Sequence, residues 1–322
     1  MKYSGIGGQA LIEGVMMKNN DRYAVAVRKP DGEIEVTTSE YKGIAGKSRF
    51  FKLPFIRGIF NFIDSMVLGM KTLTYSASFF EEEEGKVLTE EEQKKQDKKE
   101  SVLMGFTVLI SIVLAVGIFM VLPLLLVNWM NRLGVSEFWL SVAEGILRIV
   151  IFLIYIVLIS RMQDIKRVFM YHGAEHKCIN CVEHGLELNV ENVRKSSKQH
   201  KRCGTSFLLI VMIVSVIMFI LVGIFFKIDT LWLRILSRII LIPVIAGVAY
   251  EFLRLAGRSD NALVNFLSKP GLAFQRLTTN EPDDSMIEVA IKSVEAVFDW
   301  REYLKENFGD DETVKEAAAS EE

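Results

Sequence analysis

The sequence lacks an excess of charge of either sign. Its 322 residues include 38 lysines and arginines against 40 aspartates and glutamates. Proteins that bind nucleic acid through its phosphates carry a dominant basic face, so we expect no nucleic-acid partner. Residues 1–53 also lack an apolar stretch followed by a cleavage site, and we therefore expect no cleavable signal peptide.

Apolar residues, in contrast, are abundant and clustered. Half of the sequence is hydrophobic, and a helix of about 20 apolar residues is long enough to cross a bilayer. The sequence therefore predicts a mainly α-helical, polytopic membrane protein in contact with the lipid bilayer. In the last predicted transmembrane helix we expect Arg234 and Arg238 to extend to the headgroups. The four predicted transmembrane helices are residues 101–130, 138–160, 206–226 and 231–252.

The distribution of lysine and arginine orients these helices. Residues 161–205, between the second and third helix, are rich in both, and the positive-inside rule places such a segment in the cytoplasm. The two short connections around Arg132 and Lys227 carry little charge and fit the outer side. We therefore expect a multi-pass protein of the plasma membrane with both termini inside.

The segments outside the transmembrane helices differ in character. Residues 22–28 and 33–38 alternate around a Pro-Asp-Gly turn signal, which predicts a β-hairpin. Residues 54–80 are apolar on most sides, but Asp64 would be costly in the middle of a bilayer, so an interfacial helix is preferred over a fifth span. The predicted order is a cytoplasmic glycine-rich segment and β-hairpin (1–53), an interfacial or re-entrant helix (54–80), a charged linker (81–100), the first two transmembrane helices (101–160), a cytoplasmic His/Cys metal loop (161–205), the last two transmembrane helices (206–252), a cytoplasmic amphipathic region (253–309) and a disordered acidic tail (310–322).

Two local patterns predict packing. Glu144 and Arg148 are four residues apart on one helical face, which favours an ion pair that fixes helix packing over the lining of a polar path. Near the C-terminus, Ser285 and Glu288 fit a capping box, and apolar residues then recur at helical spacing. We expect an amphipathic helix there that packs on the cytoplasmic part.

Histidine and cysteine are scarce, and both are confined to one segment. All four histidines and all three cysteines fall between residues 170 and 205. Thiols in the cytosol stay reduced, which favours metal binding over a disulfide. His172, Glu175 and His176 form an H-x-x-E-H string, whose histidines project from the same face of a helix. In enzymes with this string the histidines bind zinc and the glutamate takes a proton from the water that the metal activates.

A second group of candidate ligands lies close before the third transmembrane helix. His200 and Cys203 come from the opposite side of the same loop, and imidazole together with thiolate favours a divalent metal, most of all zinc. Three protein ligands and a water would make a catalytic site, whereas four would make a structural one. Arg202 is a candidate for holding an anionic substrate, although a basic residue near lipid headgroups is the plainer interpretation.

A competing pattern is present in the same segment. Cys178 and Cys181 form a C-x-x-C turn beside two histidines, which also fits a structural zinc knuckle. His184 is interpreted as a loop histidine and not as a ligand. The spacing alone leaves the knuckle open as an alternative.

These residues together resemble those of the YqhQ-like family of bacterial membrane proteins, which are described as predicted metal-dependent enzymes without an established reaction. The resemblance covers nearly the whole chain. Lys201 departs from the family pattern, which usually has proline there, and Cys178 and Cys181 are not fixed parts of it. The matching segments are residues 7–17 (GGQALIEGVMM), 171–177 (YHGAEHK), 202–207 (RCGTSF) with His200 before them, and 276–284 (RLTTNEPDD).

The resemblance implies a site and leaves two functions open. It implies that Glu175 is the base and that Gln9 and Glu13 approach the site. The first hypothesis is a membrane-bound, metal-dependent hydrolase that works at the cytoplasmic face. The second is a non-enzymatic scaffold or assembly factor whose loop is stapled by a structural ion. The implied metal ligands are His172, His176, His200 and Cys203.

Overall fold

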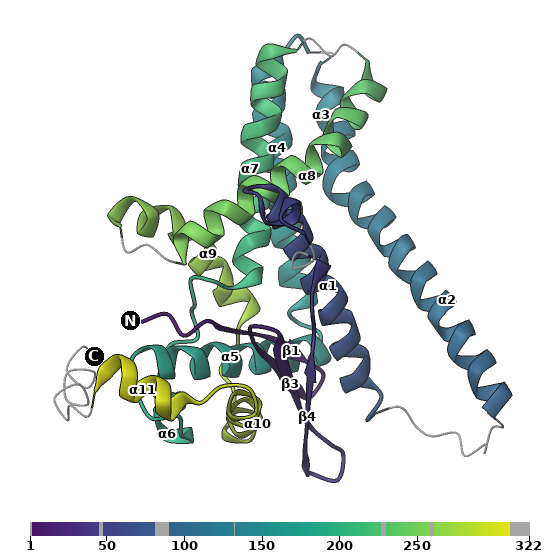
Figure 1. Cartoon of the computed structure of the whole chain (residues 1–322). Coiled ribbons are helices and arrows are strands. Elements are labelled where there is room, and N and C mark those ends of the chain that lie inside the picture. The colour runs from purple at the N-terminus through teal and green to yellow at the C-terminus, as the bar shows by residue number, and fades with distance from the viewer. Residues whose placement is uncertain are drawn as a thin grey trace. The chain divides into compact units, whose positions relative to one another are not determined.

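The computed structural model describes residues 2–44, 48–80, 90–131, 133–226, 230–257 and 261–309 (Figure 1). The chain forms two compact units. Unit 1 comprises Met1–Phe80, Ile156–Val211 and Ala246–Glu322, and unit 2 comprises Glu81–Tyr155 and Met212–Ile245. The predicted acidic tail at 310–322 and residues 81–89 of the predicted linker lie outside the described residues.

Unit 1 contains a four-stranded antiparallel sheet in the order β1-β2-β3-β4. The predicted hairpin is confirmed, because it corresponds to β3 and β4. Strands β1 and β2 were not predicted, since glycines interrupt the first and both faces of the second are buried, which hides the alternation. Leu11, Met16 and Val25 belong to one buried cluster, and Val15 and Met17 belong to another. The strands are β1 (Ile6–Leu11), β2 (Gly14–Asn19), β3 (Arg22–Arg28) and β4 (Ile34–Glu40).

Helices pack against both faces of this sheet. Helix α1 contacts β1 and β3, α5 contacts β1 and β2, and α10 contacts β2 and β3. Strands β2 and β3 are therefore buried between helices, which explains why they carry two apolar faces, whereas β4 is partly exposed. The elements of unit 1 outside the sheet are η2 (Phe50–Lys52), α1 (Ile56–Ala77), α5 (Gln163–Glu183), α6 (Val190–Lys195), α9 (Ala262–Thr278), α10 (Asp284–Glu295) and α11 (Trp300–Phe308).

The predicted amphipathic helix near the C-terminus corresponds to α10, but its cap differs from the prediction. Asp283, and not Ser285, is the N-cap residue. Its Oδ1 atom accepts hydrogen bonds from the Met286 N–H at 3.0 Å and from the Ser285 hydroxyl at 2.6 Å. Ser285 therefore supports the cap and does not form it. An aspartate two residues before the predicted cap competes for the same helix N–H groups, because both side chains are good caps.

The predicted interfacial segment corresponds to α1, which buries Asp64 inside unit 1. Asp64 is buried and accepts hydrogen bonds from the Tyr41 hydroxyl and the Ile44 N–H. Its carboxylate is thus held by protein donors and not by lipid, which removes the cost that argued against burying it. The location of α1 in the membrane interface stays a prediction.

The structure contains four described helices that are long and apolar enough to cross a membrane. Only 11% to 33% of the apolar window of each helix is buried within the protein, so most of their apolar surface faces outward, as expected for contact with lipid. The predicted mainly α-helical membrane fold is confirmed, and the chain is an integral membrane protein. The four helices are Val102–Met130, Phe138–Ile159, Gly204–Phe225 and Trp232–Ala256.

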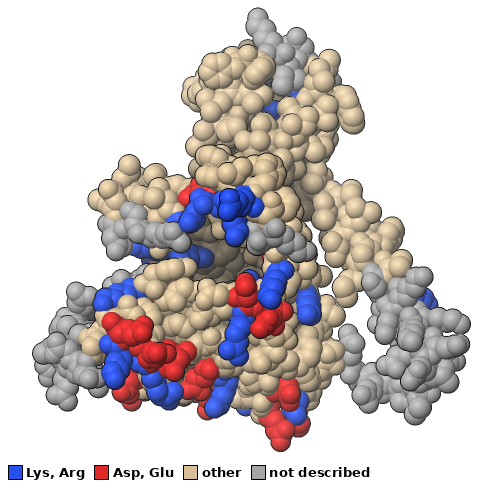
Figure 2. All heavy atoms as spheres, in the orientation of Figure 1, with Lys and Arg blue, Asp and Glu red and all other residues tan. Residues whose placement is uncertain are grey.

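Most residues of these apolar helices belong to unit 2, and the remaining residues belong to unit 1. The boundary between the units falls within α4, α7 and α8. Figure 2 shows charged side chains gathered over the sheet, α5, α10 and α11, whereas the described helices of unit 2 present mostly uncharged residues. The elements concerned are α2 (Glu90–Val116), η3 (Gly117–Val121), α3 (Leu122–Asn131), α4 (Glu137–Ile159), α7 (Gly204–Phe225) and α8 (Leu231–Ala256).

A buried charged cluster holds α4, α7 and α8 together within unit 2. Glu144 accepts hydrogen bonds from Arg148 at 2.9 Å and from Arg238 at 2.8 Å. Arg148 also donates to the Ser215 hydroxyl, and both guanidinium groups lie over the Phe219 ring. The expectation that Arg238 extends to the headgroups was wrong, because a carboxylate on another helix binds it inside the bundle.

Candidate metal centre

Helix α5 carries the H-x-x-E-H string, and its C-terminal half is buried. Every residue from Tyr171 to Glu183 is buried, because the sheet, α6 and α10 surround this half of the helix. Gly173 is required by close packing. A Cβ atom there would clash with the backbone oxygen of Asn280. Only glycine therefore fits between His172 and Ala174.

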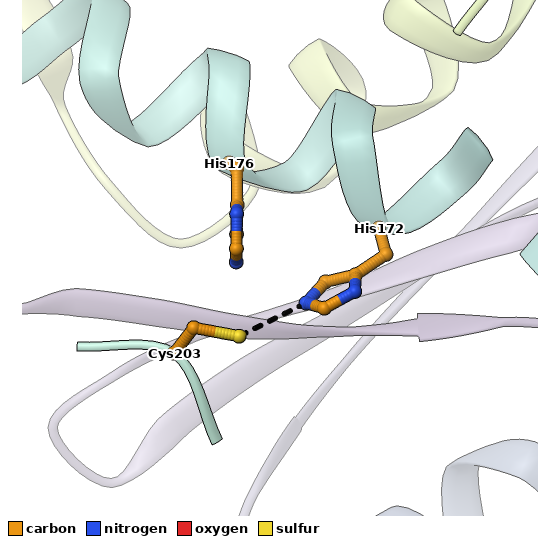
Figure 3. Close-up of side chains that lie close together, drawn as sticks. All are labelled: His172, His176 and Cys203. Carbon is orange, nitrogen blue, oxygen red and sulfur yellow. Dashed lines mark hydrogen bonds between the residues drawn. The ribbon is translucent and has the colours of Figure 1, made fainter. Parts of the chain in front are cut away.

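Three of the predicted ligands converge at one point. The ligand atoms of His172, His176 and Cys203 all lie within 4.8 Å of one another, and Figure 3 shows the two imidazoles directed from α5 toward the sulfur. His172 Nε2 is 3.2 Å from Cys203 Sγ. The three residues are 9%, 1% and 6% exposed, respectively. Ligand atoms around one tetrahedral zinc ion are about 3.5 Å apart, so a small adjustment would admit an ion.

Backbone carbonyl groups orient both imidazoles from behind. His172 Nδ1 is 2.8 Å from the Thr278 oxygen, and His176 Nδ1 is 2.7 Å from the Lys198 oxygen. A carbonyl oxygen only accepts, so each Nδ1 carries the proton, and in the neutral ring Nε2 keeps its lone pair. This arrangement is typical of histidines that bind metals, whose second nitrogen is held by a fixed acceptor.

The site also favours a thiolate at Cys203. Burial raises the pKa of the Cys203 thiol, but His172 and His176 outweigh this and hold the pKa well below its usual range. Conversely, burial lowers the pKa of His172, but the neighbouring sulfur raises it to about 9. Thiolate is the form of cysteine that binds metals, and an ion would take the place of the shared proton.

Glu175 lies beside this group of three. Its Oε2 is 4.0 Å from His172 Nε2, the atom that faces Cys203. The Gly8 N–H donates to the Glu175 carboxylate, and burial raises the pKa of Glu175 above its usual value although both histidines oppose this. A Cβ atom at Gly8 would lie 2.8 Å from the Glu175 Cγ, so β1 fixes the side chain from the other side.

His200 and Arg202 belong to a second polar group built around Glu183. His200 Nε2 is 3.4 Å from Glu183 Oε2, and Arg202 pairs with the other carboxylate oxygen. Burial raises the pKa of Glu183, but His200, Arg202 and the Ser4 N–H lower it to about 2. His200 lies outside the group of three, although its ring is 5.8 Å from that of His176. Its assignment as a ligand stays a prediction.

The two residues that the resemblance added lie at other contacts. Glu13 pairs with Arg167 and accepts a hydrogen bond from the Tyr171 hydroxyl, and therefore ties the β1–β2 turn to α5. Gln9 contacts Gly69 of α1, on the face of β1 opposite to Gly8. Their approach to the metal site remains a prediction.

The competing C-x-x-C pair behaves as two buried thiols. Cys178 lies in the core cluster, and Cys181 donates to the Glu187 oxygen at 3.3 Å. Burial raises the pKa of Cys178 well above its usual value and that of Cys181 to about 12. His184 is bound at Nδ1 to the Asn180 oxygen. This placement offers the zinc knuckle no support.

Thr205 and Thr278 are site residues that sequence reasoning missed. The Thr205 N–H and hydroxyl lie 3.4 and 3.0 Å from Cys203 Sγ, so the first turn of α7 helps to hold the thiolate. The Thr278 hydroxyl donates to Thr205, and its carbonyl orients His172. The signal in the sequence was the position of both threonines inside the matching segments RCGTSF and RLTTNEPDD.

The four apolar helices and the buried His/Cys group define an integral membrane protein with a candidate metal centre next to a membrane helix. A sequence profile of the family described as "Protein of unknown function (DUF1385)" matches residues 53–300, and the chain belongs to this family. It is 36% identical to the "Uncharacterized protein YqhQ" of Bacillus subtilis (strain 168) over 293 residues, which cover 89% of this chain and 90% of that protein. The resemblance predicted from the motifs is thereby confirmed. No solved structure matches the chain.

Proposed function

We propose that this protein is a metal-dependent hydrolase of the plasma membrane whose site faces the cytoplasm. The observation that carries the proposal is the convergence of His172, His176 and Cys203, with both imidazoles fixed through Nδ1. Two imidazoles and a thiolate form a ligand set that suits zinc. The cytoplasmic orientation rests on the lysines and arginines of the segment between α4 and α7.

The arrangement of the remaining residues supports catalysis. Three protein ligands leave one position open in a tetrahedral site, and an ion bound there would act as a Lewis acid and make water a better nucleophile. Glu175 lies at the edge of the ligand group, where its carboxylate can accept a proton from that water. The Gly8 N–H and the packing of β1 keep this carboxylate in place.

A scaffold with a structural ion is the second candidate. The specific observation in its favour is that Glu175 Oε2 is only 4.0 Å from His172 Nε2. A modest rotation would bring the carboxylate to the ion as a fourth protein ligand, and four protein ligands make a closed, structural site.

Metal analysis of the purified full-length protein tests the shared premise. We expect about one zinc per chain in the native protein. The zinc content of the His172→Ala/His176→Ala variant should be at least tenfold lower, because two of three ligands are gone. His184→Ala is the matched control and should retain the metal, because this histidine is bound elsewhere. Equal metal content in the double variant and the native protein would exclude the site.

X-ray absorption spectroscopy then separates the two candidates. The hydrolase predicts two nitrogens, one sulfur and one water oxygen around zinc, and Glu175→Gln should leave both the metal content and this coordination unchanged. The scaffold predicts that Glu175→Gln lowers the metal content or alters the oxygen shell. The second result would make Glu175 a ligand and remove the proposed base.

A further inference from the structure

Helix α1 is amphipathic in the reverse sense of a helix in a soluble protein. Its outward face is apolar and is formed by Phe62, Ile63, Met66, Val67 and Met70, all of which are exposed. The face toward the protein contains mainly small or polar residues, namely Gly58, Asp64, Leu68, Gly69, Thr72 and Ser76. A helix that exposes its apolar side needs an apolar environment outside the protein.

Helix α9 repeats this reversed pattern. Leu263, Phe266 and Leu267 are exposed, with Phe266 at 63%. The helix carries Lys269 and Arg276 but no acidic residue. An apolar face flanked by cations is typical of a helix that lies on an anionic lipid surface. The buried face contains Ser268, Gly271, Gln275 and Thr278 besides Val264 and Phe274.

Both helices contact the first turn of a membrane helix. Phe62 of α1 stacks on Phe207 of α7, with ring centroids 5.5 Å apart. Gln275 of α9 donates to the hydroxyl of Ser206 at 2.8 Å. Because α7 is a candidate membrane span from Gly204 onward, the apolar faces of α1 and α9 lie next to the end of a helix that suits the bilayer.

Helix α9 reaches the metal centre directly, whereas strand β1 lies between α1 and the centre. The last residue of α9, Thr278, binds His172 through its carbonyl oxygen. Helix α1 contacts Gln9 through Gly69, and the residue before Gln9 contacts Glu175. Cys203 directly precedes the first residue of α7. The centre therefore lies at the end of a membrane helix and beside α9, whose outer face suits the bilayer.

We propose that the substrate of the metal centre is an amphiphilic lipid with an anionic headgroup, which reaches the centre from the bilayer along α9. The proposal rests on the proposed function, because it requires the centre to bind a substrate. A lipid already in the membrane needs no release into water to reach a site at the end of α7. The cations of α9 favour an anionic headgroup over a neutral one.

Cobalt spectroscopy tests the binding of lipid at the centre. Full-length protein is loaded with Co²⁺ in a neutral detergent, and its visible spectrum is followed while dihexanoyl phosphatidylglycerol or glycerophosphoglycerol, its headgroup without acyl chains, is added. We expect the lipid to change the spectrum at a concentration at least tenfold lower than the concentration of glycerophosphoglycerol that has the same effect. An equal response to both compounds, or a response to neither, would overturn the proposal.

Two variants connect this response to α9. Phe266→Asp should raise the half-saturating lipid concentration at least tenfold, while the Co²⁺ content and the lipid-free spectrum stay unchanged. Val36→Asp is the matched control, because Val36 is an exposed apolar residue of β4, and it should leave the lipid response as it is. An unchanged lipid response in Phe266→Asp would contradict access along α9.

A measurement without metal distinguishes failure of this proposal from failure of the proposed function. Phe266→Trp is reconstituted in phosphatidylglycerol vesicles with brominated acyl chains, which quench tryptophan by contact. We expect the emission added by Trp to be quenched, whereas that added by Val36→Trp should not be. Absence of cobalt binding would remove the proposed function, while absence of quenching would show that another copy or the solvent covers α9 and would overturn the lipid proposal.

Discussion

Two groups of ionisable side chains are buried in different parts of this chain, and they are satisfied in opposite ways. In unit 2, Glu144 lies between Arg148 and Arg238, and its carboxylate accepts hydrogen bonds from both guanidinium groups. In unit 1, three residues direct potential ligand atoms toward one another, namely His172, His176 and Cys203. The first group pairs opposite charges, whereas the second gathers electron-pair donors.

This difference shows which features indicate a site. Burial alone does not, because both groups are buried. In unit 2 the side chains bind one another, so their role is to join helices. In unit 1 the bonds to backbone carbonyl groups are made through Nδ1, on the far side of each imidazole, and His172 Nε2 faces the sulfur, another potential ligand atom. The direction of the polar atoms thus separates a packing contact from a candidate metal centre.

The largest effect is expected when the carboxylate of unit 2 is removed. Glu144→Ala leaves two buried arginines without their counter-charge, and breaking a buried ion pair costs about 3–5 kcal/mol. The free energy of unfolding in mixed micelles should fall by that amount, while the metal content of the folded protein stays unchanged. The triple variant Glu144→Leu/Arg148→Met/Arg238→Met should recover most of the loss. A loss of metal in Glu144→Ala would show that the two groups are coupled.

Removal of metal should have a smaller effect, and it should depend on unit 1 alone. A ligand present at about a hundred times its Kd stabilises the folded state by about 2.7 kcal/mol. Chelation should therefore lower the thermal midpoint of the native protein and of Glu144→Ala alike. It should not change the midpoint of the His172→Ala/His176→Ala variant. A chelator response in that double variant would locate the ion elsewhere.

Gly173→Ala tests how tightly the frame of the metal centre is packed. The added methyl group meets the Asn280 backbone oxygen, and overpacking of this kind costs about 1–3 kcal/mol. Metal affinity should fall as well, because His172 is the adjacent residue. Gly105→Ala in α2 is the control, since its Cβ position meets no atom within 4 Å outside its chain neighbours and its own helix backbone, and it is far along the chain from every ligand. Equal stability and zinc affinity of the two variants would mean that the packing around α5 is looser than the structure shows.

The smallest effect is expected at the cap of α10. Asp283→Ala should cost about 1 kcal/mol, and Ser285→Ala should cost less, because Asp283 is the residue that accepts from the helix N–H. Burial raises the pKa of Asp283, but hydrogen bonds from Ser285 and Met286 hold it below the usual 3.8. A depressed pKa adds stability above pH 3.8 that is lost as the pH falls through the folded-state value. Acid titration of the unfolding free energy should show this loss in the native protein and not in Asp283→Ala.

The sequence was sufficient for the features that depend on local pattern. Apolar length located the membrane helices, and the turn signal located the β3–β4 hairpin. The H-x-x-E-H spacing placed His172 and His176 on one helical face, because side chains four residues apart share that face. Each of these features is encoded within a few neighbouring residues.

Features that depend on distant partners could not be predicted. Arg238 binds a carboxylate 94 residues away, and nothing in its own helix distinguishes it from an arginine that extends to the headgroups. His200 faces Glu183, which carries no motif. Strand β1 owes its place to a backbone that passes close to Glu175 and Gly69, and glycine-rich sequence by itself is typical of a loop.

The carbonyl group that orients His172 belongs to Thr278, which is 106 residues further along the chain. A ribosome that makes this protein has therefore completed every described membrane helix before that acceptor exists. Until then the first imidazole of the string has no fixed tautomer, although both histidines and the cysteine have already been synthesised. Loading of an ion at this point would consequently be a late step in biogenesis, and a chain that stops before residue 278 would carry the ligands without a finished receptor for the ion.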